Sequence, residues 1–142
     1  MKRFQFTLDS ILELRLEEEQ EAEMHLGRAM GEWNHLNEKK MKCMAIRESQ
    51  SPAVRSEDLL QSGLYYARIN QEIHGLQKEM DSREGELEHL RENYRVARSK
   101  REGLDKLKEK RKKEHSDIQR RAEAHTLDDL LNNMNRLKQA GD

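Results

Sequence analysis

The chain is short of the residues that build a compact globular core. Hydrophobic residues make up 34% of its 142 residues and aromatic residues 4%, whereas charged residues make up 39%. Globular domains usually carry about 45–50% apolar and about 25% charged residues. These proportions exclude a large core and leave either a disordered chain or long helices that bury a narrow seam. The net charge of −1 and the many good helix formers favour long helices.

A single cysteine and the lack of a long apolar run indicate where the protein works. Cys43 has no second cysteine to pair with, which excludes an intramolecular disulfide and is typical of a reducing compartment. No apolar run approaches the roughly 18–20 residues that span a bilayer. The opening MKRFQFTLDS holds two cations but no continuous apolar stretch, so it predicts no secretory signal. We therefore expect a cytoplasmic protein.

The only proline, Pro52, marks the expected break between two helices. Ser51 before it is a good N-cap, and proline is tolerated at the first helical position. We expect one all-α domain over residues 1–142, its final segment capped by Thr126. The sequence predicts a first helix, a turn, a second helix and a short amphipathic C-terminal tail at about residues 7–48, 49–56, 57–125 and 126–138.

Both predicted helices carry apolar residues at alternating spacings of four and three, the pattern of a coiled-coil seam. In the first helix the seam positions are Leu8, Leu12, Arg15, Glu19, Ala22, Leu26, Ala29, Trp33, Leu36, Lys40 and Cys43. In the second they are Tyr66, Ile69, Ile73, Leu76, Met80, Arg83, Leu87, Leu90, Tyr94, Ala97, Arg101 and Leu104. Two such helices joined by a short turn predict an antiparallel two-helix coiled coil with a longer second helix.

The position of the turn also predicts the register of the two helices. With the turn near Pro52, Leu8 should lie opposite about residues 96–100. Because the second helix is longer, we expect an overhang without a partner helix from about residue 100 onward.

The sequence carries no recognisable catalytic, nucleotide-binding or metal-binding motif. It has neither a GxxxxGK[ST] phosphate loop nor a GxGxxG fingerprint, and no two of its histidines are spaced as metal ligands. A two-helix coil also offers no pocket that would shift the pKa of a catalytic carboxyl group. We therefore expect no enzyme activity, no cofactor, no metal and no small-molecule substrate.

The charges are distributed unevenly along the chain. Residues 13–23 hold six acids and one base, whereas residues 100–113 hold eight bases and three acids. A solvated helix face would explain an excess of cations, but its place on the expected overhang favours a docking surface for an acidic partner or for nucleic acid phosphate. We define the basic run as Lys106, Lys108, Lys110, Arg111, Lys112 and Lys113.

Four stretches, taken in order, resemble the FliJ family of the bacterial flagellar type III export apparatus. The opening FQFTLDSILELRLEEEQEAE resembles the family's F-x-F pattern followed by L-x-x-[IV]-L-x-[LV]-R. YYARINQEIHGLQKEM is similar to its Y-x-x-x-[LI]-x-x-x-I stretch, and RENYRVARSKREGLDKLKEKRKKEH to its R-x-x-[LY]-x-x-A-x-x-x-[RK]-x-x-L-x-x-L-K-E-K segment. TLDDLL resembles the terminal L-D-E-[LI]. The resemblance covers nearly the whole chain.

The resemblance implies a function that the seams alone do not. FliJ proteins are antiparallel coiled coils that insert into the ring of the flagellar export ATPase and promote its assembly and activity. They also contact the export-gate membrane protein and some export chaperones, at the cytoplasmic face of the inner membrane. The implied gate contact falls on Tyr66, Ile73 and Gln77, and Asn70 departs from the family where an apolar residue is common. The basic run is then expected to contact the ATPase ring.

Two other classes of protein remain open at this stage. A nucleic-acid-associated coiled coil would use the basic run as a phosphate track, although the net charge near zero and the few aromatics make nucleic acid an unfavoured partner. A cytoplasmic scaffold would assemble with itself through the seam. DNA or RNA binding near physiological salt tests the first class, and a native mass tests the second.

Overall fold

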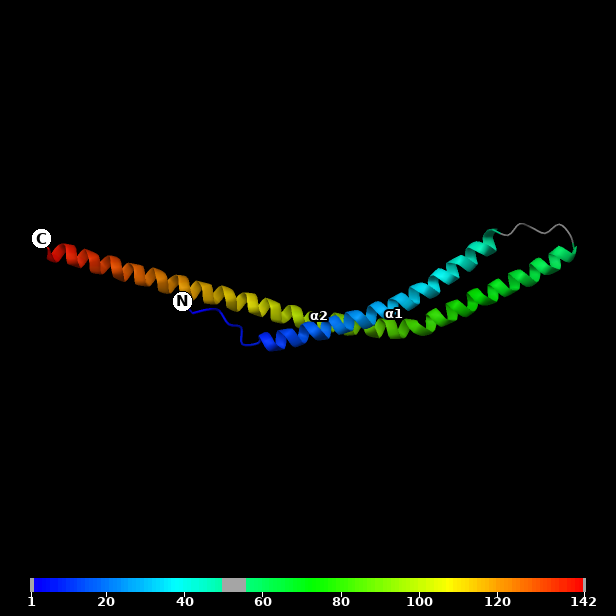
Figure 1. Cartoon of the computed structure of the whole chain (residues 1–142), viewed down its shortest axis with the longest axis horizontal. Coiled ribbons are helices and arrows are strands. Elements are labelled where there is room, and N and C mark those ends of the chain that lie inside the picture. The colour runs from blue at the N-terminus through cyan, green and yellow to red at the C-terminus, as the bar shows by residue number, and fades with distance from the viewer. Residues whose placement is uncertain (1, 50–55, 142) are drawn as a thin grey trace. The chain divides into compact units, whose positions relative to one another are not determined.

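The computed structural model describes residues 2–49 and 56–141, which form two long helices. Helix α1 spans Asp9–Ser49 and helix α2 spans Ser56–Ala140 (Figure 1). No strand occurs among the described residues, so the predicted all-α class with two helices is confirmed. Asp9 lies in the first turn of α1 and Lys138 in the last turn of α2, where each charge complements the helix dipole. The predicted turn at Pro52 lies outside the described residues.

The start of α1 and the course of α2 differ from the predicted boundaries. The Asp9 backbone N–H donates to the Phe6 carbonyl at 3.2 Å, and α1 begins there rather than at residue 7. The predicted boundary between a second helix and a C-terminal tail is wrong, because α2 continues through Thr126. The Thr126 hydroxyl donates to the Ala122 carbonyl at 2.9 Å, so it bonds to the preceding turn instead of capping a new helix. Neither proline nor glycine occurs between Gly103 and Gly141 to interrupt α2.

The contacts divide the chain into two units. Unit 1 consists of Met1–Leu16 with Ser99–Asp142, and unit 2 is Glu17–Arg98. Each unit contains part of α1 and part of α2. The grouping of the whole chain into one domain stays a prediction.

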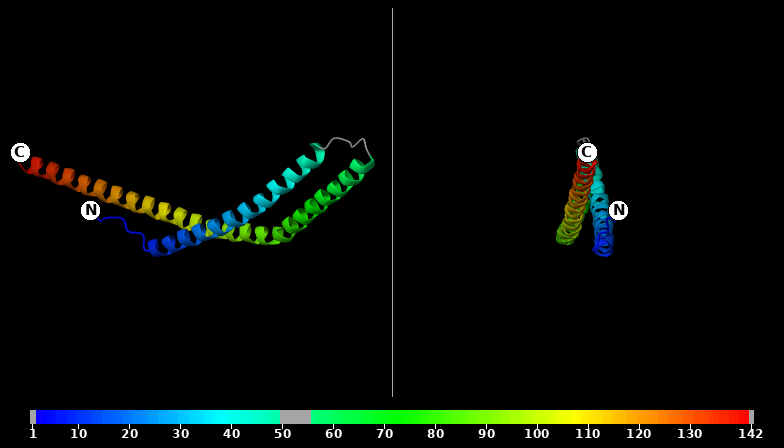
Figure 2. Two further views of the ribbon diagram at one scale, coloured as in Figure 1. Left: turned by 45° about the vertical axis from the view of Figure 1, so that its right-hand side comes forward. Right: turned by 90° about the vertical axis from the view of Figure 1, so that its left-hand side faces the viewer.

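The core of unit 2 is a narrow seam between α1 and α2, which lie side by side in the views of Figures 1 and 2. The predicted seam positions of both helices are buried or half-buried throughout. Supercoiling of the pair as a coiled coil stays a prediction. The most completely buried side chains of the unit are apolar and come from both helices: Leu36, Ile69, Ile73, Met80 and Leu87.

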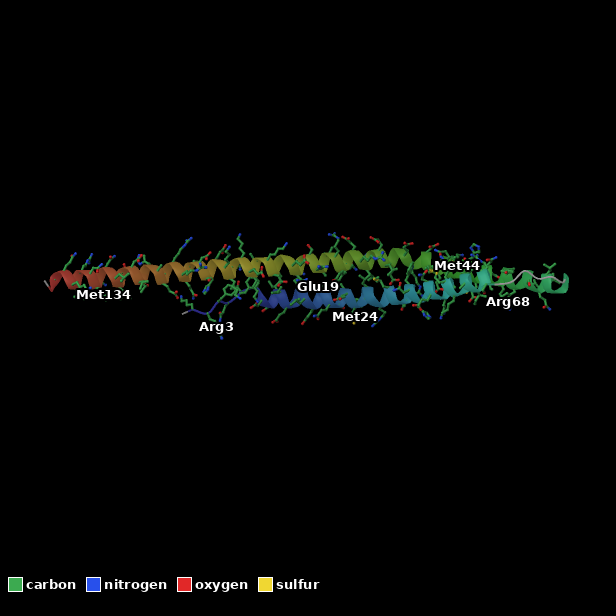
Figure 3. All side chains as sticks on the ribbon, turned by 90° about the horizontal axis from the view of Figure 1, so that it is seen from above. Arg3, Glu19, Met24, Met44, Arg68 and Met134 are labelled. Atoms are coloured by element: carbon green, nitrogen blue, oxygen red, sulfur yellow. The ribbon has the colours of Figure 1, made fainter. Side chains whose placement is uncertain are left out.

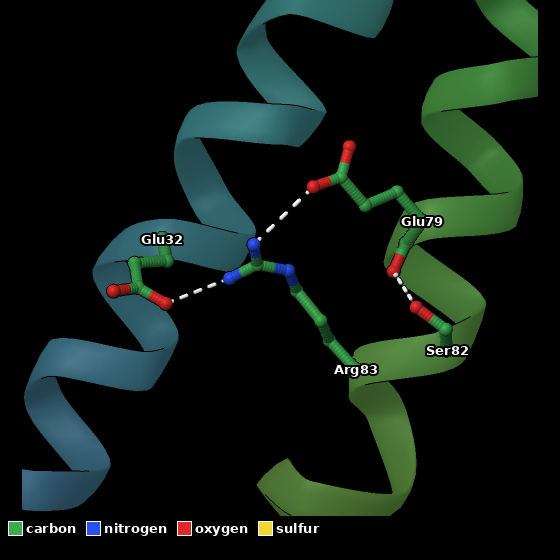
Figure 4. Close-up of polar contacts among 4 residues, drawn as sticks. All are labelled: Glu32, Glu79, Ser82 and Arg83. Atoms are coloured by element: carbon green, nitrogen blue, oxygen red, sulfur yellow. Dashed lines mark hydrogen bonds and ion pairs between the residues drawn. The ribbon is translucent and has the colours of Figure 1, made fainter.

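Polar residues within the seam of unit 2 are paired across it. Arg83 donates to Glu32 of α1 at 2.7 Å and to Glu79 of its own helix at 3.2 Å (Figure 4). Farther along, the Lys40 ammonium donates to the Gln77 side-chain carbonyl. These partners let long polar side chains occupy seam positions, and they select one alignment of the two helices.

The cross-helix contacts establish an antiparallel arrangement within each unit and fix its register. In unit 2, Arg47 donates to Asn70 at 3.0 Å. In unit 1, Lys108 forms a 2.9 Å ion pair with Asp9. In each pair the two residue numbers add up to 117, as expected for one constant antiparallel register. In this register Leu8 lies opposite about residue 109. The predicted partner of Leu8 at residues 96–100 is therefore wrong.

The difference between the predicted and the observed register arises at the start of α2. In this register Ser49, the last residue of α1, lies opposite about residue 68 of α2. The first turns of α2 therefore run past the end of α1, and Leu60 and Leu64 are 70% and 66% exposed there. The sequence prediction placed the midpoint of the pairing at Pro52, whereas the pairing is centred near residue 58.

Candidate protein-interaction surface

The N-terminal segment, residues 2–6, lies along α2 in unit 1 although it is not helical. The Phe6 side chain is only 5% exposed. The Phe4 ring packs against the imidazole of His115 with 5.6 Å between the ring centroids. At the far end, the Gln119 amide donates to the Lys2 carbonyl at 2.8 Å. The segment thus continues the antiparallel pairing beyond the start of α1.

Sequence reasoning missed this packing, because it used FQF only as part of a resemblance. A usable signal was present in the spacing of Phe4 and Phe6. Residues two apart point to the same side of an extended chain, and a pair of aromatics at that spacing predicts an extended segment with one buried face.

Phe6 also contacts two cations of the basic run. The Lys108 ammonium lies 5.9 Å from the centroid of the Phe6 ring, and the Arg111 guanidinium lies 5.7 Å from it. Each such cation–π contact contributes about 0.5–1 kcal/mol at an exposed site. Lys108 also pairs with Asp9, as described above. These two members of the basic run therefore stabilise the N-terminal segment on α2.

These contacts correct the predicted overhang, which does not begin at about residue 100. Partners from the N-terminal part of the chain contact α2 as far as Gln119. The reach has a simple origin, because an extended chain rises about 3.3 Å per residue and a helix only about 1.5 Å. The five residues 2–6 thus cover as much of α2 as roughly eleven helical residues do.

Three other lysines of the basic run face away from these contacts. At about 100° per residue, Lys106, Lys110 and Lys113 share one face of α2. Lys108, Arg111 and His115 lie on the opposite face, toward the N-terminal segment. All three lysines of the first set are exposed. We call Lys106, Lys110 and Lys113 the lysine face.

Lys112, the remaining member of the basic run, borders a shallow pocket. Lys2, Arg3 and Phe4 from the N-terminal segment line the pocket with Lys112, His115, Ser116 and Gln119 of α2, around a volume of about 520 Å³. Figure 3 shows Arg3 beside α2. The pocket has no carboxylate in its lining and therefore no acid that could work with His115 as a catalytic pair.

The three residues that the family resemblance assigns to the export-gate contact lie largely on the side of α2 that faces α1. Ile73 is 9% exposed and belongs to the core of unit 2, and Tyr66 is half-buried. Gln77 accepts from Lys40 of α1 and donates to Asp81 at 2.8 Å. The departure at Asn70 has a structural explanation, because Asn70 accepts the hydrogen bond from Arg47. A polar residue at that position secures the pairing of the helices.

Other kinds of site find no support among the described residues. No group of three or more His, Cys, Asp or Glu side chains in residues 2–49 and 56–141 is arranged to hold a metal ion. Within the same ranges, neither helix has a stretch long and apolar enough to cross a membrane. Burial and the neighbouring carboxylate of Glu72 raise the pKa of the Cys43 thiol, which leaves less of the reactive thiolate at neutral pH.

Comparison with protein families matches the chain over residues 4–140 to the family described as flagellar FliJ protein. No curated protein and no solved structure matched the chain. The matched range begins at Phe4 and ends at the last residue of α2, so it includes residues 4–6 of the N-terminal segment as well as both helices. The chain therefore belongs to the FliJ family, the non-catalytic components of the flagellar protein export apparatus.

Proposed function

We propose that this chain is the coiled-coil stalk that binds the flagellar export ATPase ring and promotes the assembly and activity of the ring. The stalk works in the cytoplasm, at the cytoplasmic face of the inner membrane, and links the ring to the export gate. Family membership and the antiparallel pairing within each unit support this role. Export chaperones are further partners of the same protein.

The lysine face is the observation that carries the proposed contact with the ring. Lys106, Lys110 and Lys113 are exposed, share one side of α2 and point away from the N-terminal segment. Lys108 and Arg111 are engaged with Asp9 and Phe6, so they serve the fold of unit 1. A ring lined with carboxylates is the complementary partner. Charge complementarity of this kind raises association rates more than it raises affinity. This suits a transient contact, which forms and dissociates repeatedly.

A charge-reversal experiment on binding tests this proposal. The variant carries Lys106→Glu, Lys110→Glu and Lys113→Glu, and its binding to the purified export ATPase is measured at low and at physiological salt. A matched control reverses three exposed lysines of unit 2, Lys39, Lys42 and Lys78. Both variants change the net charge equally, and glutamate forms helix about as well as lysine.

Binding should be lost in the lysine-face variant and retained in the control. Wild-type binding should weaken as salt rises, because exposed charges are screened over about 8–10 Å at these ionic strengths. Equal binding by the two variants, whether both strong or both weak, would show that the ring does not bind specifically to the lysine face.

The proposed gate contact lies near Tyr66 and Gln77, with Ile73 in a supporting position. Because Ile73 is buried against α1, its contribution to the gate contact is to hold neighbouring side chains in place. Pull-down of the cytoplasmic part of the gate protein by wild type and by Gln77→Ala tests this contact. Gln77→Ala should weaken capture, and capture equal to that of wild type would remove Gln77 from the contact.

The nucleic-acid alternative would need aromatic rings beside the lysine face on which bases could stack. Base stacking on aromatic rings contributes about 1–3 kcal/mol per base in proteins that bind single strands. Phe4 and Phe6, the aromatics nearest the basic run, pack onto the opposite side of α2. We therefore favour a protein partner for the lysine face.

A further inference from the structure

The C-terminal part of α2 carries an exposed apolar stripe. The stripe begins eight residues beyond Gln119, whose amide donates to the Lys2 carbonyl of the N-terminal segment. In Figure 3 no other described segment of unit 1 lies beside α2 at Met134. The stripe consists of Leu127, Leu130, Leu131, Met134 and Leu137, which are 58%, 56%, 50%, 59% and 73% exposed.

The stripe is a different face of α2 from the one that receives the N-terminal segment. At about 100° per residue, the centre of the stripe is turned by roughly 100° from the line of Lys108, Arg111 and His115. Extending the N-terminal contacts along α2 would therefore leave Leu127, Leu131 and Met134 uncovered. A partner for this face would come from outside the intramolecular pairing.

The sequence of the stripe is close to symmetrical about Asn132. Leu127 and Leu137 lie five residues before and after this centre, and Leu130 and Met134 lie two residues before and after it. If a second copy lies antiparallel, Leu127 meets Leu137 and Leu130 meets Met134 in successive layers. Such a contact is isologous, because each copy presents the same surface to the other. Leu131 of each copy then lies next to the two-fold axis.

The charges around the stripe favour the antiparallel orientation. Asp128 and Asp129 lie before the centre, whereas Arg136 and Lys138 lie after it. Antiparallel copies bring the acidic end of one stripe to the basic end of the other. Parallel copies would place like charges together, which is unfavourable.

We propose that the C-terminal stripe is a self-association surface, through which two copies of this chain pair antiparallel about Asn132. The contact is weak, because five side chains per copy fall well below the roughly 20–30 residues per side of a standard interface. It therefore forms where the chain is locally concentrated. This pairing is independent of the lysine face and of the seam between α1 and α2.

Sedimentation of the full chain over a wide concentration series tests the proposal. Wild type should change from monomer to dimer as concentration rises. A variant with Leu130→Lys and Met134→Lys should associate at least roughly tenfold more weakly. A matched control with Arg120→Glu and Arg121→Glu, outside the stripe, should associate as wild type does. A wild type that stays monomeric throughout, or a stripe variant that pairs equally well, would overturn the proposal.

A charge exchange tests the same contact without changing its apolar residues. Asp128→Lys with Asp129→Lys makes both ends of the stripe basic, and Arg136→Asp with Lys138→Asp makes both ends acidic. Each variant alone should associate more weakly than wild type, whereas an equal mixture of the two should regain association. A mixture that associates no better than its components would contradict the proposal.

Spin labels report the orientation, after Cys43→Ser removes the native thiol. Labels at residue 133 should lie close together across the two-fold axis. Labels at residue 124 should be separated along the helix by about 24 Å, the rise of sixteen residues. Short separations at both positions would show parallel pairing and overturn the proposed geometry.

Discussion

At the scale of single residues, the basic run divides into side chains that serve the fold and side chains that remain available. Lys108 and Arg111 surround the Phe6 ring, and Lys108 also pairs with Asp9. Lys106, Lys110 and Lys113 lie on the other side of the helix. The sequence predicted the whole run as one docking surface, because composition alone does not show which cations an extended segment will occupy.

Phe6→Ala should release the N-terminal segment from α2. Full burial of a phenylalanine side chain contributes about 1.5–3 kcal/mol, and Phe6 is 5% exposed. Amide hydrogen exchange should therefore become faster at residues 2–8, while exchange in unit 2 stays the same. Phe4→Ala, which removes a half-buried ring, should have a smaller effect. Unchanged exchange at residues 2–8 in the Phe6 variant would contradict the packing described for unit 1.

Cys43 should react slowly with a thiol-alkylating reagent. Burial and the Glu72 carboxylate raise the pKa of this thiol, so the thiolate becomes the major form only at a pH above the usual range for cysteine. The rate of alkylation should rise with pH along a curve displaced to higher pH than that of the unfolded chain. Glu72→Gln should move the curve part of the way back. A curve identical in folded and unfolded protein would argue against this environment.

At the scale of helices, the seams were predictable and the register was not. A repeat of four and three residues is a local pattern, and it placed buried or half-buried positions correctly over residues 8–43 and 66–104. Register depends instead on pairs such as Arg47 with Asn70, which no periodicity identifies. The boundary expected at Thr126 failed because a threonine hydroxyl can also bond to a carbonyl one turn earlier, inside a continuous helix, as Thr126 does with Ala122.

Ile73→Asp or Leu87→Asp should unfold the pairing of α1 with α2 in unit 2. These side chains are 9% and 4% exposed, and a buried carboxylate without a partner costs several kcal/mol unless it is neutralised. Thermal unfolding followed by circular dichroism should show a large loss of stability. Val96→Asp is the matched control, because Val96 is 37% exposed and lies off the seam. Equal melting temperatures for all three variants would show that the seam is assigned incorrectly.

At the scale of the whole molecule, the net charge is −1, although residues 100–113 carry an excess of cations. The chain as a whole belongs to a family of flagellar export components. The family match covers residues 4–140, and it therefore includes Phe4 and Phe6, the lysine face and the C-terminal stripe. The resemblance could be predicted from the order of four motifs. The sequence did not predict which cations of the basic run contact the N-terminal segment and which form the lysine face. The structure was needed for this division, because the run and the segment are about one hundred residues apart in sequence.

Stimulation of the purified export ATPase by this chain is the most direct test of the lysine face as its docking surface. Wild type and the control reversed at Lys39, Lys42 and Lys78 should both stimulate ATP hydrolysis, and rising salt should weaken the stimulation. The variant reversed at Lys106, Lys110 and Lys113 should leave hydrolysis near its unstimulated rate, with helix content unchanged. Full stimulation by the lysine-face variant, or wild-type stimulation indifferent to salt, would contradict the proposed docking.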